Sequence, residues 1–91
     1  MKNISRTNIF KRDYKKIKKQ GKDINKLNNV IKIIIEGRKL DLKYRDHLLI
    51  GPFKSRRECH LEPDWLLIYK IDKKRKVIIF ERTGSHSELF E

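Results

Sequence analysis

The apolar residues of this 91-residue chain follow a helical spacing up to Leu40 and an extended spacing after it. Before Leu40, two segments place apolar residues three or four positions apart, as on one face of an amphipathic helix. After Leu40, short runs rich in apolar and aromatic residues are separated by turn-forming residues, as in the strands of a sheet. Because a chain of this length forms one domain, we expect a single α+β domain over residues 1–91.

The first helical segment carries Phe10, Tyr14 and Ile17 on one face, with lysines on the others. Asn8 is the predicted N-cap of this helix, and Gly21 is the predicted stop. The segment is therefore expected to form one short amphipathic helix.

A second helical segment follows almost at once. Asp23 is its predicted N-cap, and Gly37 is its predicted end. Its apolar stripe consists of Ile24, Leu27, Val30, Ile31, Ile34 and Ile35. Two amphipathic helices with so short a connection predict a helix hairpin.

The rest of the chain predicts one sheet. Residues 40–51 are expected to form a connection that leads into a short strand, and residues 57–61, 65–71 and 77–83 are expected to form longer strands. The last two are apolar on both faces, which is typical of central strands. Residues 3–7 would add an edge strand. Without the short strand, the predicted order is β-α-α-β-β-β, with the two-helix hairpin packed on one face of a small antiparallel sheet.

The charge of the chain is strongly positive and unevenly distributed. There are 24 Lys and Arg residues against 12 Asp and Glu, a net charge of +12. Residues 1–40 contain 13 of the basic and 3 of the acidic residues, so the helical part carries +10 and the sheet part +2. An excess of this size favours an anionic partner, either a nucleic acid or an acidic protein segment.

Several classes of protein are excluded by the same sequence. The longest apolar run, residues 65–69, is far shorter than the roughly 20 residues of a membrane span. The first residues lack the apolar segment of a secretory signal. Cys59 is the only cysteine, so no internal disulfide can form. That usage fits a reducing compartment, and we expect a cytoplasmic protein.

The three histidines point to acid–base chemistry. His47, His60 and His86 all lie in the sheet-forming part, which also contains Arg82. Cleavage of RNA without a metal needs a base for the 2′-OH, an acid for the leaving 5′-oxygen and a cation for the phosphate. Histidine suits the first two roles because its reference pKa is about 6.5. Arg82 suits the third because a guanidinium binds phosphate bidentately.

Two aromatic residues, Trp65 and Phe90, offer ring faces on which an unstacked base could lie. Each candidate also has a simpler interpretation. A single histidine in a strand is more often structural, aromatic rings more often pack in or around the core, and lysine-rich helix faces are often only solvated. Metal binding has little support, since Cys59 and His60 are neighbours in a strand and point to opposite faces.

Two longer segments resemble the YafQ branch of the RelE/ParE toxin superfamily: residues 57–70, RECHLEPDWLLIYK, and residues 81–90, ERTGSHSELF. Shorter matches extend the resemblance over residues 8–90, namely Asp46-His47 with Leu49 and Gly51, and Lys22-Asp23 with Asn25-Lys26-Leu27. The resemblance implies a compact RelE-like α+β domain and a ribosome-dependent endoribonuclease that cuts mRNA. It also implies a cognate acidic, DinJ-like antitoxin, and no cofactor.

The active-site positions of that family fall on His47, His60, Asp64, Trp65, Arg82, His86 and Phe90. Glu58 matches a further position common in the family, where it would orient a histidine or hold the basic site together. The chain departs from the family in the loop between the two motifs, at Phe53, Ser55 and Arg56. These departures leave the base or codon preference open.

The resemblance implies metal-independent cleavage by attack of the 2′-OH on the phosphate. We expect these roles: His60 or Asp64 as base, His86 as acid, Arg82 as the cation on the phosphate, His47 as a group that positions it, and Trp65 and Phe90 as the rings that hold the base. The sequence does not decide which group is the acid and which the base.

The lysines of the first helix would bind the phosphates of ribosomal RNA, without reading its sequence. They are Lys11, Lys15, Lys16, Lys18 and Lys19. Two rival functions are a non-enzymatic, gyrase-inhibiting toxin of the same superfamily and a plain basic nucleic-acid-binding module. The three histidines and Arg82 argue against the first, because an inhibitor that only binds has no need of acid–base groups.

Overall fold

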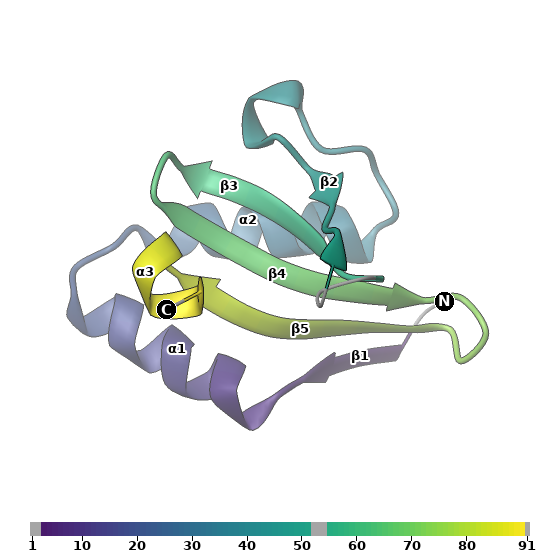
Figure 1. Cartoon of the computed structure of the whole chain (residues 1–91), viewed down its shortest axis with the longest axis horizontal. Coiled ribbons are helices and arrows are strands. Elements are labelled where there is room, and N and C mark those ends of the chain that lie inside the picture. Colours follow the sequence, from purple (N-terminus) through teal and green to yellow (C-terminus); the bar gives the residue numbers. More distant parts are fainter. Residues whose placement is uncertain (1–2, 52–54, 91) are drawn as a thin grey trace.

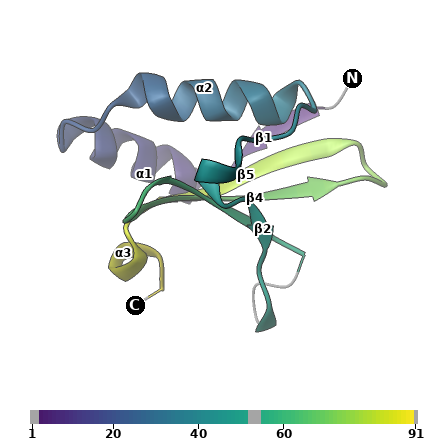
Figure 2. The ribbon, with the colours of Figure 1, turned by 90° about the horizontal axis from the view of Figure 1, so that it is seen from above.

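The computed structural model of the chain describes residues 3–51 and 55–90. Two helices lie side by side on one face of a five-stranded sheet, and a short third helix lies on the other face (Figures 1 and 2). The elements in chain order are β1 (Asn3–Arg6), α1 (Asn8–Lys19), α2 (Ile24–Ile35), the 3-10 turn η1 (Leu42–Tyr44), β2 (His47–Leu48), β3 (Arg57–Glu62), β4 (Trp65–Asp72), β5 (Val77–Gly84) and α3 (His86–Phe90). The predicted α+β class and helix hairpin are confirmed.

The sheet is mixed, which corrects the expectation of a purely antiparallel one. Its strand order is β1-β5-β4-β3-β2. The strands β2 to β5 pair antiparallel with their neighbours, whereas β1 pairs parallel with β5, from Asn3 opposite Val77 to Arg6 opposite Phe80. No hairpin joins β1 to β5, because the helices and three strands lie between them in the chain, so the direction of this pair is not set by a turn.

The start of α1 differs by one residue from the prediction. Thr7, not Asn8, is the N-cap, because its backbone is extended and its hydroxyl accepts the N–H of Phe10 at 2.9 Å. The same hydroxyl donates to the carbonyl of Glu81 at 2.8 Å and so fastens the helix to β5. Asp23 caps α2 as predicted, accepting the N–H of Asn25 at 3.1 Å.

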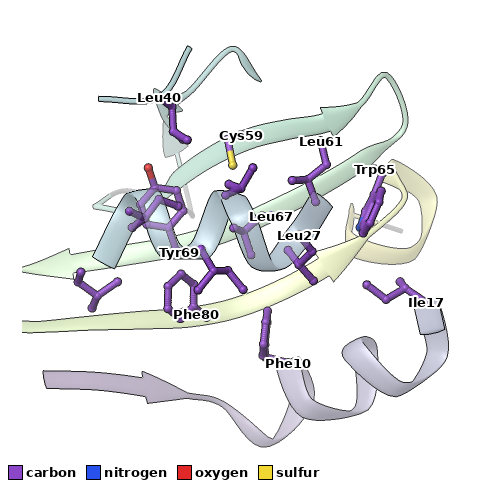
Figure 3. Close-up of a cluster of buried hydrophobic side chains, with 14 residues drawn as sticks. Phe10, Ile17, Leu27, Leu40, Cys59, Leu61, Trp65, Leu67, Tyr69 and Phe80 are labelled. Atoms are coloured by element: carbon purple, nitrogen blue, oxygen red, sulfur yellow. The ribbon is translucent and has the colours of Figure 1, made fainter. Parts of the chain in front are cut away.

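The main core lies between the helices and the sheet (Figure 3). Trp65, Leu67 and Tyr69 of β4 face α1 and α2 and are at most 2% exposed. The alternate residues Leu66 and Ile68 point to the opposite face, where they pack with Leu89 of α3. The strand β4 is therefore buried on both faces, which confirms its predicted central position.

The helix α3 was not predicted. Five residues are too few to show a helical period, and helix formation in so short a segment depends on tertiary contacts. Among the described residues, no helix has the length and apolar character that crossing a membrane would take.

Candidate active site

Three histidines from three different elements meet on the face of the sheet that α1 and α2 leave uncovered. His47 lies on β2, His60 on β3 and His86 at the start of α3. The ring centroids of His47 and His60 are 6.1 Å apart, and those of His60 and His86 are 5.8 Å apart. Phe90 extends the row, with its ring centroid 6.4 Å from that of His86. The predicted histidine cluster is thus a continuous row of rings.

A buried carboxylate lies between the first two rings of the row. Glu58 is 6% exposed, and its Oε1 is 2.9 Å from His60 Nε2 and 3.9 Å from His47 Nε2. Glu58 and His60 are two residues apart on β3, so they point to the same face of the sheet. This arrangement is consistent with the predicted role of Glu58 in orienting a histidine.

His47 is held by the segment that precedes it. Its Nδ1 is 2.6 Å from the carbonyl oxygen of Arg45, so this nitrogen carries the proton of the neutral ring. The next residue, Asp46, accepts two hydrogen bonds from Arg57, each at 3.2 Å, and one from the hydroxyl of Tyr69 at 2.6 Å. Burial, together with the hydrogen bond to Asp46, raises the pKa of Tyr69, which therefore stays protonated as a donor. Asp46 thus anchors β2 at the site.

His86 is held by Asp64 at the end of the β3–β4 turn. One carboxylate oxygen of Asp64 lies 2.8 Å from Nδ1 of His86 and accepts the main-chain N–H of the same residue at 2.9 Å. The main-chain and side-chain hydrogen bonds from His86 lower the pKa of Asp64. At neutral pH Asp64 is therefore an ionised acceptor, and its contact with His86 engages Nδ1 and not Nε2.

The helix α3 is itself fastened by a capping arrangement. The N–H of Ser85 donates to Glu88 Oε1 at 2.9 Å, and the N–H of Glu88 donates to the hydroxyl of Ser85 at 3.2 Å. Glu88 Oε2 also lies 2.6 Å from Nζ of Lys16 on α1. The contact with Lys16, followed by the hydrogen bond from Ser85, lowers the pKa of Glu88 to about 2. The last helix, which carries His86 and Phe90, is thus joined to the first.

Arg82 reaches the same face of the sheet but has a partner of its own. It lies opposite Ile68 in the pairing of β5 with β4. Its Nε donates to Oδ2 of Asp13 at 2.8 Å, and its Nη2 donates to Oδ1 at 3.3 Å. The predicted phosphate-binding cation is therefore paired with a carboxylate of α1.

Trp65, which was predicted to hold an RNA base, lies in the core of this structure. Its side chain is fully buried between the sheet and the helices (Figure 3). Its Nε1 donates to the hydroxyl of Thr83 at 3.0 Å, and Nζ of Lys22 lies 5.5 Å from the ring centroid. The position after Asp64 starts β4 on its core-facing side, so the ring has no face open to a base. Phe90, by contrast, is 39% exposed beside His86.

The predicted RNA-binding lysines of α1 lie on the surface of the helix. Of these, Lys16 forms the ion pair with Glu88, whereas Lys11, Lys15, Lys18 and Lys19 are exposed. The loop departures can be placed only in part. Arg56 forms an ion pair with Glu81 of β5, Ser55 is exposed, and Phe53 lies outside the described residues.

Three ligand atoms in the row are close enough to hold a metal ion. His47, Glu58 and His60 each offer one ligand atom, and these three atoms all lie within 4.8 Å of one another. Imidazole and carboxylate are ligands of zinc and copper. Sequence reasoning considered Cys59 with His60 instead, and Cys59 is indeed on the opposite, buried face. The sequence signal for the group of His47, Glu58 and His60 was the spacing of Glu58 and His60, which are two residues apart in one strand.

Sequence reasoning also missed three carboxylates that hold the site together. Asp46, Asp13 and Glu88 each bond to a residue far away in the chain. Asp13 carried one signal, since it is the only acidic residue in a helix rich in lysine. What it pairs with depends on the packing of α1 against β5, which no local pattern predicts.

Known proteins resemble this chain over almost its whole length. A family described as bacterial toxin of type II toxin–antitoxin system, YafQ, matches residues 2–91. The mRNA interferase toxin YafQ of Escherichia coli strain K12 is 43% identical over 82 residues, which are 89% of this chain and 87% of the relative.

Two solved structures share the fold. A chain of the crystal structure of the E. coli DinJ–YafQ complex superposes with a TM-score of 0.93 at 39% identity, covering 100% of both chains. A metal-bound toxin from Helicobacter pylori superposes with a TM-score of 0.92 at 42% identity, covering 99% of this chain and 100% of that one. Both likenesses extend over nearly the whole length of the chain.

Proposed function

The chain belongs to the YafQ family of bacterial type II toxins, and from this premise we propose that it is an mRNA interferase, an endoribonuclease that cuts mRNA on the ribosome. The observation that carries the proposal is the row of three histidines, each of which has a fixed oxygen partner. Rings held in this way can take and give protons at defined positions. The E. coli relative at 43% identity is named for the same activity.

His60 is the proposed base for the 2′-OH. Its Nε2 faces the buried carboxylate of Glu58 at 2.9 Å, so Nδ1 is the nitrogen that can accept a proton. A carboxylate behind the ring stabilises the imidazolium that forms when the proton arrives. The 2′-oxygen then attacks the phosphorus, forming a new P–O bond as the 2′-OH proton passes to His60.

His86 is the proposed acid for the leaving oxygen. Asp64 binds its Nδ1, so Nε2 of the protonated ring carries the proton to be donated. The bond between phosphorus and the 5′-oxygen breaks, and the proton passes from His86 to that oxygen. The products are a 2′,3′-cyclic phosphate and a 5′-hydroxyl. Asp64 acts through His86 in this scheme, which leaves the base role to His60.

Three further residues complete the site. The guanidinium of Arg82 would stabilise the charge that develops on the phosphate. His47, next in the row to His60, would position the same phosphate. The ring of Phe90 would support the base on the leaving side, beside His86. No metal ion takes part in the reaction as we propose it.

The ribosome and an antitoxin are the proposed partners. The exposed lysines of α1 would bind phosphates of ribosomal RNA. A DinJ-like antitoxin with acidic character would complement a chain with a net charge of +12. The structure of the E. coli DinJ–YafQ complex, whose matched chain shares this fold, supports that assignment.

The test is cleavage of a defined mRNA in a translation reaction rebuilt from purified components. We expect new 5′ ends in the translated message, a 2′,3′-cyclic phosphate on the upstream fragment, and none of either with His60→Ala or His86→Ala. Lys74→Ala, in the exposed turn after β4, is the matched control and should cleave normally. Intact message together with trapped gyrase–DNA complexes would instead support the gyrase-inhibiting function.

Metal independence has its own test in the same reaction. The chelator 1,10-phenanthroline removes transition metals but leaves the Mg²⁺ that ribosomes need. We expect the cleavage rate to be unchanged by the chelator. Loss of cleavage that zinc or copper restores would mean that the reaction uses a metal.

A further inference from the structure

Asp13 is a mostly buried carboxylate on a helix that is otherwise rich in lysine. Its side chain is 12% exposed, and it is the only acidic residue of α1. It accepts three hydrogen bonds: from Nε of Arg82 at 2.8 Å, from Nη2 of Arg82 at 3.3 Å, and from the main-chain N–H of Thr83 at 3.1 Å. This carboxylate thus holds both the side chain of Arg82 and the backbone that follows it.

The fold explains why a carboxylate lies at this position. The parallel strand β1 covers the outer edge of β5 only as far as Phe80, which pairs with Arg6. The chain then turns into α1, and Asp13 takes the place of a strand partner for the N–H of Thr83. A group that completes the sheet edge in this way has its orientation fixed by the backbone.

A bulge brings Arg82 to the face of the histidines. The pairing of β4 with β5 shifts between Ile68 and Tyr69, where Tyr69 lies opposite Phe80 but Ile68 lies opposite Arg82. In a regular strand, Arg82 would share the core-facing side of Phe80, two residues away. The extra residue, Glu81, moves Arg82 to the other face of the sheet. Ile68 and its partner on β3, Glu58, lie on that same face.

The contact with Asp13 leaves part of the guanidinium available. A guanidinium has five N–H donors in a rigid plane, and Asp13 accepts from Nε and Nη2. Within the part of the chain that the structure describes, both hydrogens of Nη1 and one of Nη2 remain. On the basis of the proposed ribonuclease function, we propose that Asp13 is a positioning residue, which fixes the plane of Arg82 so that its remaining donors meet the scissile phosphate.

The positioning can be tested in single-turnover cleavage on mRNA-programmed ribosomes. Asp13→Asn keeps an acceptor for the N–H of Thr83 but removes the charge and the two-point hold on Arg82. We expect it to lower the cleavage rate by about 10- to 100-fold, the range for a misplaced catalytic group. The toxin concentration that gives half of the maximal rate should be unchanged. In an Arg82→Ala background, the same substitution should lower the rate no further.

The matched control is Asp23→Asn, which makes the same exchange of carboxylate for amide at the N-cap of α2, where the side chain bonds to Asn25 and Lys26. Because Asn caps a helix about as well as Asp, this variant should keep a thermal midpoint and a cleavage rate close to those of the wild type. A wild-type rate for Asp13→Asn would overturn the proposal, as would an equal loss with and without Arg82. A wild-type rate would mean that Arg82 does not depend on Asp13 for its orientation. An equal loss with and without Arg82 would mean that Asp13 acts only on the fold.

A measurement without cleavage separates this proposal from the proposed function. Hydrogen exchange at Nε of Arg82, followed by NMR in the free toxin, should be slow in the wild type and fast in Asp13→Asn. Equal exchange in the two proteins would overturn the positioning role, even if the toxin cleaves mRNA. Slow exchange in a wild type that does not cleave would refute the ribonuclease and leave the hold on Arg82 intact.

Discussion

One carboxylate oxygen of Asp64 receives both the main-chain N–H and the ring Nδ1 of His86, at 2.9 and 2.8 Å. An ionised carboxylate only accepts, so the tautomer of His86 is set by this contact. The same two hydrogen bonds lower the pKa of Asp64, which keeps the carboxylate ionised at neutral pH. This pairing supports the proposed acid role of His86.

We expect His86→Ala to lower single-turnover cleavage by about 10²- to 10⁴-fold, the usual contribution of a general acid. Asp64→Asn should cost less, because an amide oxygen can still accept from the ring but cannot stabilise its positive charge. The alkaline limb of its pH–rate profile, where a general acid loses its proton, should move to lower pH, since an imidazolium without the carboxylate loses its proton more easily. An Asp64→Asn profile that matches the wild type would show that Asp64 does not act through His86.

The ion pair between Glu88 of α3 and Lys16 of α1 predicts that the stability of the fold depends on pH. Glu88 has a pKa of about 2 in the folded chain, against 4.5 for an ordinary glutamate, because Lys16 and Ser85 bind its charged form. The stabilisation that the ionised Glu88 gives the folded chain is therefore fully present above about pH 4.5 and is lost as the pH falls toward 2. The thermal midpoint of Glu88→Gln should lie below that of the wild type at pH 6, and the two should converge near pH 2.

The control for this experiment is Glu36→Gln, which removes an exposed pair with Arg38 at the end of α2. Exposed pairs contribute little to stability, so its midpoint should follow the wild type at every pH. A constant difference between Glu88→Gln and the wild type down to pH 2 would mean that the lost packing, not the charge, is responsible.

Part of the fold was predictable because the signals are local. The helix hairpin follows from the spacing of Phe10 and Ile17 and from the cap at Asp23. The direction of β1 was not predictable, since it depends on a pairing with β5 at the other end of the chain. The helix α3 was not predictable either, because the contacts that hold it come from Lys16 and Asp64.

The candidate site divides in the same way. The histidines were found because residue type alone indicates acid–base chemistry, and the resemblance to the family marked their positions. The burial of Trp65 was not predictable from residue type or from the resemblance, since neither states which face of β4 a residue occupies. The shift in register that places Arg82 was likewise invisible, because a bulge has no signature in this strand's sequence.

The exposed lysines of α1 predict that the affinity for the ribosome depends on salt concentration. Each phosphate contact contributes about one unit to the slope of log affinity against log salt. We expect the triple change of Lys15, Lys18 and Lys19 to Glu to weaken ribosome binding and to lower that slope by about three units. The same triple change at Lys73, Lys74 and Lys76, in the exposed turn between β4 and β5, is the control. An equal effect of the two sets would mean that net charge alone is responsible.

The cluster of His47, Glu58 and His60 predicts inhibition by zinc. An ion bound to these three groups would occupy the ring nitrogens beside Glu58 and pull the proposed base out of its working orientation. Zn²⁺ added in excess should therefore stop cleavage, and 1,10-phenanthroline should restore it. Calorimetry should show zinc binding that Glu58→Gln weakens and His86→Gln leaves in place. Zinc binding that survives Glu58→Gln would place the ion elsewhere.

The burial of Trp65 predicts that this residue stabilises the fold and does not contact RNA. Trp65→Phe loses the hydrogen bond to Thr83 and part of the core volume, which should lower the free energy of unfolding by about 1–3 kcal/mol. Below its thermal midpoint the variant should cleave at the wild-type rate. Phe90→Leu keeps an apolar side chain but loses the ring, whose stacking on a base is worth about 1–3 kcal/mol, so its cleavage should fall while its stability changes little. A folded Trp65→Phe that fails to cleave would return Trp65 to the substrate site and require β4 to open when RNA binds.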